Sequence, residues 1–455
     1  MDEGDAIGAA PVARAWVAVI GGATAGAEVA AYLAARNVNV AVFDQHARPY
    51  GKIEDGLPRW HEALRRKEFH HIDERLGHPN VHYVPCTKVG RDVDFTEMVT
   101  AWGFAAVVLA CGAWRDRALP VPDAQRFVNR GLVYQNPFVI AFNHAHEPNA
   151  PALPLADGAL VLGGGLAAID VAKILMLETS RRALAERGHT VSVSELEHKG
   201  IPATLASLRL TWAELELAGC TIVYRRQPHD MPLVDVHEPA DAEQIEKAHK
   251  TRLKLLNHAQ EKFLFKVEPL ASPEAIVADA DERVAGMLFR RNEAQGDKVV
   301  ATSSTFTLPT TLVVSAIGSV PEPIKGIPLR GELFDFSDQH LGTLPGFPNV
   351  FSVGNVVTGR GNIAASRKHA RDLSETAVSA FLGLGGERDA EAKVSAALSA
   401  PARTQAQVVA SAVHEHVEKA DATGHAALVA RVAQLQRRVG YTGNYAAWMA
   451  LHPAL

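Results

Sequence analysis

Cysteine is scarce in this sequence, and the few cysteines present are far apart. Three of the 455 residues are cysteines: Cys86, Cys111 and Cys220. This spacing leaves no Cys-X-X-Cys pair, which excludes a dithiol relay and any iron–sulfur cluster held by cysteines of this chain. We expect Cys111 to be a small buried packing residue.

Long apolar runs, a basic leader and strong net charge are lacking as well. The longest uncharged run, residues 299–321, is rich in Ser and Thr and is interrupted by Pro309. It therefore predicts two strands and not a membrane span. The acidic first residues do not have the basic and then apolar layout of a signal peptide, so we expect a cytoplasmic protein. A formal net charge of -5 gives nucleic-acid binding no electrostatic support.

Histidine is present in quantity but without the spacing of a metal site. The 20 histidines are scattered along the chain. His70 and His71 are adjacent, and His414 stands near His416, but neither pair has further ligands at a recognisable distance in the sequence. We expect no bound metal.

A glycine-rich stretch near the N-terminus organises the rest of the chain. An apolar strand at residues 16–20 leads into a glycine turn, a helix, and a second apolar strand that ends in Asp44. Gly21 allows the tight turn, and Gly26 lets the helix pack closely on the strand. Asp44 stands where a carboxylate would bind a ribose hydroxyl. The stretch predicts a dinucleotide site, although Ala23 occupies the place of the middle glycine.

A second copy of this pattern follows later in the chain. Gly163, Gly165 and Ala168 come directly after an apolar strand at residues 159–162 and again open a helix. Two such fingerprints in one chain are typical of a flavoprotein with two dinucleotides, FAD at the first site and a nicotinamide nucleotide at the second.

The strand after the second helix ends in two arginines. Arg225 and Arg226 follow the strand at residues 220–224, at the place where an NAD site would offer an acid. Each guanidinium group can donate two parallel hydrogen bonds to a 2′-phosphate, so the sequence favours NADP over NAD. The alternative is a pair of solvated arginines.

The loop at residues 49–61 resembles that of the adrenodoxin reductase type of ferredoxin-NADP reductase. A proline, an aromatic residue and a glycine are followed there by a second glycine and a histidine at the family's spacings. The resemblance implies that Gly51 lets the backbone approach the flavin and that His61 is the active-site histidine. It also implies that Asp170, in a stretch like the family's Leu-Asp-Val-Ala, is the partner of His61 near the nicotinamide. Two simpler alternatives stay open: a histidine in the first turn of a helix, and an acid favoured by a helix dipole.

Further cofactor residues follow from the same resemblance, which covers residues 16 to about 381. Gly112 belongs to the turn that closes over the FAD. Gly354, the Gly361 loop and a helix starting near Ile363 would face the pyrimidine end of the flavin, where negative charge develops on reduction. Asn355 departs from the pattern, since the wider superfamily has aspartate there and adrenodoxin reductases have tryptophan.

We therefore expect an α/β fold with two Rossmann-like dinucleotide-binding domains and a C-terminal helical extension. The FAD-binding domain would be discontinuous, at residues 1–145 and 320–400, and the NADP-binding domain, residues 146–319, would be inserted into it. The segment 383–401 would be a linker. Two amphipathic helices at residues 404–419 and 426–439 would make up the extension, residues 401–455, and would pack on the core, dimerise into a homo-oligomer or bind a partner.

The expected function is that of an NADPH-dependent FAD oxidoreductase. Hydride would pass from NADPH to FAD and single electrons from there to a ferredoxin-like iron–sulfur protein. Arg65, Arg66 and Lys67 form a basic run on one helix. Such a run is commonly a solvated helix face, although in the resembled family a basic surface receives an acidic ferredoxin. One alternative is an electron-input subunit of a glutamate-synthase-like complex, because the segment after Arg226 is similar to that enzyme's small subunit. Against it, only about 15 residues precede the first strand, so we expect that subunit's clustered-cysteine N-terminal domain to be absent. Another is a non-catalytic flavin- or nucleotide-binding module, an alternative that Ala23 and Asn355 keep open.

Overall fold

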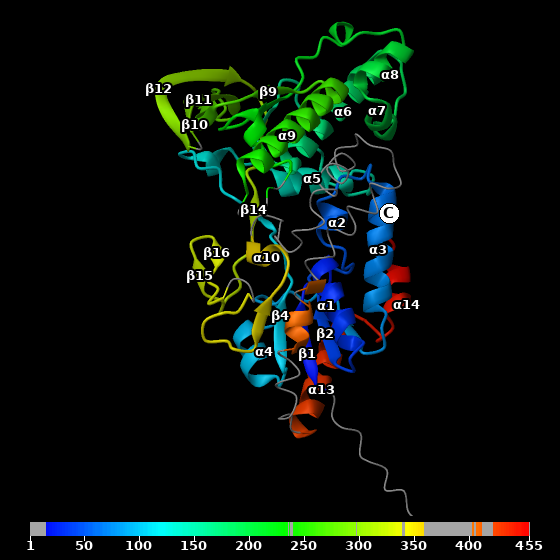
Figure 1. Ribbon diagram of the computed structural model, residues 1–455. Coiled ribbons are helices and arrows are strands. Elements are labelled where there is room, and N and C mark those ends of the chain that lie inside the picture. The colour runs from blue at the N-terminus through cyan, green and yellow to red at the C-terminus, as the bar shows by residue number, and fades with distance from the viewer. Residues whose placement is uncertain are drawn as a thin grey trace, which may run out of the picture.

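The computed structural model describes residues 15–234, 236, 240–296, 298–338, 342–358, 403–404, 406–411 and 422–454. Gly361, Ile363, the expected linker 383–401 and most of the expected helix 404–419 lie outside the described residues. The described chain forms two α/β units, drawn one above the other in Figure 1.

The first unit is built on a five-stranded parallel sheet in the order β17-β4-β1-β2-β3. Its strands are β1 (Trp16–Ile20), β2 (Asn39–Phe43), β3 (Val81–Val84), β4 (Ala106–Leu109) and β17 (Val350–Ser352). These runs are almost wholly apolar because helices cover both faces of the sheet. β17 pairs with β4 although far from it in sequence, so the first unit is discontinuous as expected.

Successive residues of β1 pack into different halves of the core. Val17 and Val19 lie in the cluster beneath α1 (Thr24–Ala34), α3 (Glu62–Leu76) and α14 (Tyr445–Leu451). Ala18 and Ile20 lie in the cluster beneath α4 (Phe95–Ala101) and α13 (Ala422–Arg438). This alternation follows from the two-residue period of a strand.

The C-terminal helices α13 and α14 pack on the first unit, one on each face of its sheet. The Tyr445 hydroxyl donates to Asp73 Oδ1 at 2.7 Å, and Trp448 Nε1 donates to the Ala47 carbonyl at 2.8 Å. Leu428 and Val432 of α13 are buried in the core. Of the alternatives for this extension, packing on the core is confirmed for α13, which corresponds to the expected helix 426–439. The sequence did not predict α14, which packs on the opposite face, and both helices lie beside the blue N-terminal elements in Figure 1.

The second unit has a five-stranded parallel sheet in the order β6-β13-β7-β8-β9. Its strands are β6 (Leu132–Tyr134), β13 (Val313–Ser315), β7 (Leu160–Leu162), β8 (Thr221–Val223) and β9 (Lys266–Glu268). Its helices are α5 (Gln135–Asn143), α6 (Leu166–Glu186), α7 (Val193–Lys199), α8 (Ile201–Ser207) and α9 (Ala242–Phe263). β6 and α5 precede the expected domain boundary at residue 146, yet β6 pairs with β13 and so belongs to this sheet.

An antiparallel sheet covers the face of the second sheet that the helices leave open. It consists of β10 (Ala271–Ala278), β11 (Val284–Gln295) and β12 (Lys298–Pro309). The last two strands pair as an antiparallel hairpin. Met287 and Phe289 of β11 pack against Leu160 and Leu162 of β7, while Val161 points to the helical side.

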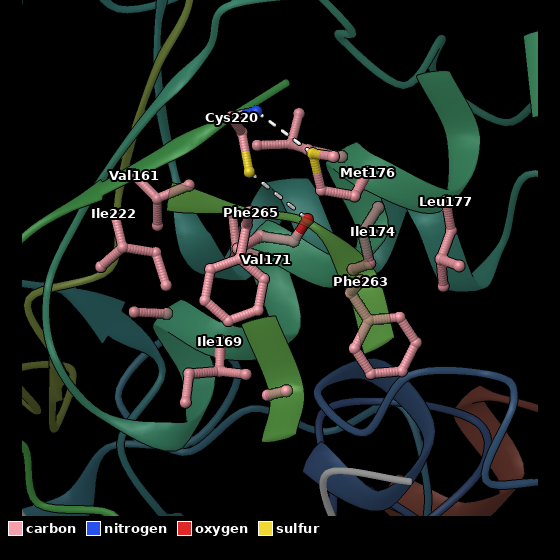
Figure 2. Packing of buried hydrophobic residues seen from close by; sticks show 14 of the residues in the cluster. Val161, Ile169, Val171, Ile174, Met176, Leu177, Cys220, Ile222, Phe263 and Phe265 are labelled. Carbon is pink, nitrogen blue, oxygen red and sulfur yellow. Dashed lines mark hydrogen bonds between the residues drawn. The ribbon is translucent and has the colours of Figure 1, made fainter. Parts of the chain in front are cut away.

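Cys220 is part of the helical half of this core, among the apolar side chains in Figure 2. Its backbone N–H donates to Met176 Sδ at 3.1 Å, and its thiol donates to the Ala172 carbonyl at 3.6 Å. Burial raises the pKa of this thiol far above its usual value, so Cys220 is a packing residue and not a nucleophile.

Two short segments connect the units. β5 (Arg115–Asp116) and β14 (Ser319–Val320) pair as an antiparallel ribbon between the sheets. Lys52, the first residue of α2 (Lys52–Asp55), reaches from the first unit to this ribbon and to α5: its Nζ donates to Ser319 Oγ at 3.3 Å and to Asn136 Oδ1 at 3.1 Å. These contacts are partly buried, and the loss of solvent around the ammonium group lowers the pKa of Lys52 to about 8. Further elements are a hairpin, β15 (Leu329–Arg330) with β16 (Leu333–Phe334), the short helix α10 (Asn355–Thr358), and 3-10 helices at Ala124–Phe127, Ala213–Leu215 and Pro228–Asp230.

Candidate functional site: two dinucleotide-binding turns

The first glycine turn joins β1 to α1 with backbone contacts that only glycine allows. Gly21 has a φ of +102°, and a Cβ placed there would lie 2.6 Å from the Ala110 carbonyl oxygen. A Cβ on Gly26 would lie 1.8 Å from the Gly21 carbonyl oxygen. The turn and the first part of α1 are therefore packed backbone against backbone, as expected for a dinucleotide fingerprint.

Two other expected residues approach the same helix end. A Cβ on Gly51, whose φ is +53°, would lie 2.9 Å from the Cβ of Ala23. A Cβ on Gly354, whose φ is +73°, would lie 3.0 Å from the Cβ of Ala25. The alanine at the middle-glycine position is thus accommodated by the missing side chain of Gly51. The loops from residue 51 and residue 354 both close on the N-terminus of α1.

Asp44 organises the turn through its carboxylate. Oδ2 accepts the N–H of Gly22 at 2.8 Å, and Oδ1 accepts the N–H of His46 at 2.9 Å. Burial raises the pKa of Asp44 above its usual value, and these two hydrogen bonds act against that rise. The carboxylate lies at the end of β2, where a dinucleotide ribose binds in this kind of unit.

Substituting Asp44 by asparagine should weaken flavin binding strongly. An amide has one acceptor oxygen where the carboxylate has two, so either the Gly22 or the His46 N–H would face an NH2 group. An unsatisfied buried donor costs about 1–3 kcal/mol, so we expect flavin retention to fall by about tenfold or more, measured as flavin per protein after dialysis.

Asp92→Asn is the matched control for this substitution. Asp92 also accepts a backbone N–H, from Lys88 at 2.8 Å, but in a surface turn. Full flavin retention by Asp44→Asn, or equal loss in the control, would contradict the role given to Asp44.

Trp114 lies beside the first glycine turn, although the sequence motifs did not single it out. It follows Gly112, which has a φ of +68° and would place a Cβ 3.8 Å from Trp114 Nε1. The indole also lies 3.8 Å from a Cβ on Gly51 and 5.9 Å, between ring centroids, from His46. Cys111 lies in the same turn, and burial raises the pKa of its thiol to about 12, so it stays protonated.

The second glycine turn has free space at its middle position, Gly165, where the first turn has the methyl group of Ala23. Gly163 has a φ of +145°, and its Cβ would lie 2.3 Å from the Ala316 carbonyl oxygen, so this position has the same tight approach to a neighbouring strand. Gly165 is the N-cap of α6, and a Cβ there would meet no atom within 4 Å. Ala168 is fully buried under the helix. The space over Gly165 and the N–H groups of α6 suit a pyrophosphate.

The arginine pair lies beside this second turn. β8 runs parallel to β7, so Tyr224, Arg225 and Arg226 follow the same sheet edge as Gly163. Arg225 is exposed, and Arg226 Nε lies 3.4 Å from Asp230 Oδ2. Both arginines therefore stand at the edge where the adenine ribose of a dinucleotide binds.

His61 and Asp170 come from facing elements. His61 is the N-cap of α3, next to Trp60, whose ring lies 4.6 Å below the Lys173 Nζ on α6. Arg59 pairs with Glu178, also on α6, at 3.1 Å. The loop with the histidine thus packs on the helix that carries Asp170. The pairing of His61 with Asp170 stays a prediction.

Asp170 is an acid that holds its proton at neutral pH. Its side chain is 3% exposed, and Oδ1 accepts no hydrogen bond from the described residues. Burial raises the pKa of Asp170 to about 8; the nearby Lys173 ammonium lowers it and Glu197 raises it further. Lys173 itself is fully buried and pairs with Glu197 at 3.0 Å.

The basic residues of α3 do not form one surface of the helix. Arg65 is buried, and its guanidinium donates to the Glu54 carbonyl at 3.0 Å, so it faces the interior and not a partner. Arg66 is exposed but pairs with Glu62 one turn earlier. A run of basic letters on an amphipathic helix spreads over different faces because successive residues are 100° apart.

The described chain thus has two linked α/β units, each with a glycine turn between the central strand of its sheet and the helix that follows, an arrangement that suits two dinucleotides. Residues 15–208 match the family model of pyridine nucleotide-disulphide oxidoreductases. The resemblance to ferredoxin reductases of the adrenodoxin reductase type, which the motifs predicted, is confirmed by the relatives given below. So is the α/β fold class.

Individual relatives agree with this assignment. The chain is 28% identical over 374 residues to NADPH-ferredoxin reductase FprA of Mycobacterium tuberculosis, covering 72% of this chain and 74% of the relative. It is 24% identical over 332 residues to the mitochondrial NADPH:adrenodoxin oxidoreductase of Arabidopsis thaliana, covering 64% of each. The solved structure of Mycobacterium tuberculosis FprA in complex with NADPH superposes with a TM-score of 0.66 at 21% identity, over 93% of this chain and 90% of that one.

Proposed function

We propose that this protein is an NADPH-dependent FAD oxidoreductase that passes electrons to a ferredoxin-like iron–sulfur protein. The convergence of Gly21, Gly26, Gly51 and Gly354 on the N-terminus of α1, with a second open turn at Gly165, carries the proposal. The relatives named NADPH-ferredoxin reductase and NADPH:adrenodoxin oxidoreductase support the nucleotide and the acceptor.

The chain's own residues bind and align the two cofactors. The backbone N–H groups of the α1 turn would hold the FAD pyrophosphate, and Asp44 its ribose. The Gly165 turn would hold the pyrophosphate of NADPH, and Arg225 and Arg226 its 2′-phosphate. The cofactors supply the hydride and single-electron chemistry, while the protein supplies proximity and orientation.

We place the remaining expected site residues around the junction of the two units. His61, Asp170, Gly112 and Asn355 would line the region where flavin and nicotinamide meet. Gly361 and Ile363 lie outside the described residues and stay expectations. The contacts of residues 59–60 with α6 support this arrangement, because they bring the histidine loop onto the helix of Asp170. A neutral Asp170 could hold a proton there without placing a negative charge beside the reduced flavin.

The partner and location are proposed from simpler observations. Among the described residues, no helix combines the length and apolar character needed to cross a membrane. All three cysteines are free thiols, which favours a reducing compartment such as the cytoplasm. The ferredoxin-like acceptor would receive electrons directly from the flavin, since no dithiol exists to relay them.

An anaerobic titration followed by absorption spectroscopy tests the proposed function. We expect purified protein to carry flavin absorption bands that bleach with NADPH and far less with NADH, because only NADPH offers a 2′-phosphate to the arginines. A colourless protein, or a yellow one that neither nucleotide bleaches, would overturn the proposal in favour of a non-catalytic binding module.

A further inference from the structure

The loop after β8 and the middle of α9 bring together two histidines that the proposed function does not use. The rings of His229 and His249 lie 4.6 Å apart between centroids. Asp230 stands beside them, and one ligand atom from each of the three residues lies within 4.8 Å of the others. All three side chains are half-buried.

This cluster adjoins the second glycine turn. The ring of Tyr224 covers Gly164, where a Cβ would lie 2.3 Å from the ring. The Tyr224 hydroxyl donates to the Asp230 carbonyl at 3.1 Å. The two histidines therefore lie on the loop and helix that border the adenosine side of the nucleotide site.

Charge decides which kind of ligand the cluster suits. Four charged or titratable groups of the described residues face His249. They are the imidazole of His229, the guanidinium groups of Arg226 and Arg252, and the carboxylate of Asp230. Two guanidinium groups repel a metal cation and attract an anion. The two histidines are therefore better placed to receive a phosphate than a metal cation.

Asp230 and Arg252 act here as positioning residues. Asp230 Oδ2 accepts the Gln227 N–H at 3.2 Å and lies 3.4 Å from Arg226 Nε. Because Arg226 contacts Asp230 through Nε, its two terminal amino groups can donate a pair of hydrogen bonds to a phosphate. Arg252 donates to the His229 carbonyl at 3.3 Å and to the Val234 carbonyl at 2.7 Å, which ties the loop to α9.

We propose that His229 and His249 complete, with Arg226, a pH-dependent site for the 2′-phosphate of the nucleotide. The inference rests on the proposed NADPH function and makes both histidines specificity-determining residues for that substrate.

The direction of the pH dependence follows from linkage. Burial lowers the pKa of His249 in the free protein, and the charges of His229 and Arg252 lower it further. A bound phosphate dianion favours the protonated imidazole and raises that pKa. Binding therefore takes up a proton, so affinity is highest at low pH and falls as the pH rises through the pKa of the bound state.

The test is a titration of the flavin-loaded protein with 2′,5′-ADP from about pH 6.5 to 9, above the pKa near 6 of the phosphate itself. We expect the Kd of the wild type to rise by up to about tenfold per pH unit for one proton taken up. His249→Gln should show a flat profile near the high-pH wild-type value, and His229→Gln a reduced slope. The matched control is His258→Gln, an exposed histidine on the same helix, which should behave as wild type.

Kinetics separate a binding role from a structural one. In His249→Gln the KM for NADPH should rise while the maximal rate of flavin reduction and the reaction with NADH stay unchanged. A wild-type slope in this variant would overturn the inference. So would a pH-independent wild type that instead binds Zn²⁺ stoichiometrically through these histidines. If 2′,5′-ADP binds as expected but neither nucleotide reduces the flavin, the inference holds and the proposed function fails.

Discussion

Gly26→Ala is expected to yield a protein that no longer retains FAD and unfolds at a lower temperature. The added Cβ would lie 1.8 Å from the Gly21 carbonyl oxygen, and a Cβ needs more than 3 Å. The opposing atom belongs to the backbone, so no side chain can turn away. α1 would have to move off β1, which costs at least about 1–3 kcal/mol as overpacking and misplaces the N–H groups of the turn. Flavin absorbance per protein and the thermal midpoint measure the effect.

Gly165→Ala is the matched substitution in the second unit. Its Cβ would meet no protein atom within 4 Å, and its φ of −86° suits alanine. This variant should keep its flavin and its thermal midpoint, while the methyl group fills the space over the turn and raises the KM for NADPH. A stable, flavin-loaded Gly26→Ala protein would contradict the packing described for α1.

The second large effect concerns Asp170, whose replacement by asparagine should stabilise the protein at pH 8. The pKa of Asp170 is about 8 in the folded protein and near 3.8 in an exposed carboxyl group. Between these values the folded state binds a proton that the unfolded chain has released, so stability falls as the pH rises through this window. One pKa unit corresponds to about 1.4 kcal/mol, so the penalty at pH 8 is on the order of several kcal/mol. Asparagine removes it, and near pH 4 the two proteins should be equally stable.

Thermal midpoints at about pH 5 and pH 8 measure this difference. Glu197→Gln should instead lower the thermal midpoint, because it removes the carboxylate that lies 3.0 Å from the buried Lys173 ammonium. If the thermal midpoint of Asp170→Asn at pH 8 is not above that of the wild type, the carboxyl group is better solvated than its burial indicates.

The same variant separates stability from function. If Asp170 holds a proton beside the nicotinamide as proposed, its replacement should slow flavin reduction by NADPH while the protein becomes more stable. Such opposed effects are typical of functional groups held in an unfavourable environment. Increased stability with an unchanged reduction rate would leave Asp170 as a buried structural acid.

The two glycine turns could be predicted because the residues that shape each turn lie close together in the sequence. Gly21, Gly26, Asp44, Gly163 and Ala168 lie in contiguous strand–turn–helix stretches, whose period and turn residues encode the backbone directly. Ala23 departs from the fingerprint, which has a glycine at this position. The structure explains it, since the loop that brings Gly51 to Ala23 leaves room for the methyl group.

By itself, the sequence determined the two dinucleotide units, their order and the arginine pair that favours NADP. Only the tertiary structure decided that Arg65 is buried and that β6 joins the second sheet. It also decided that α13 and α14 pack on opposite faces of the first sheet and that the rings of His229 and His249 lie side by side. Local backbone preference specifies a turn within a few residues. Contacts between distant segments depend on which apolar faces and charges fit together once the whole chain has packed.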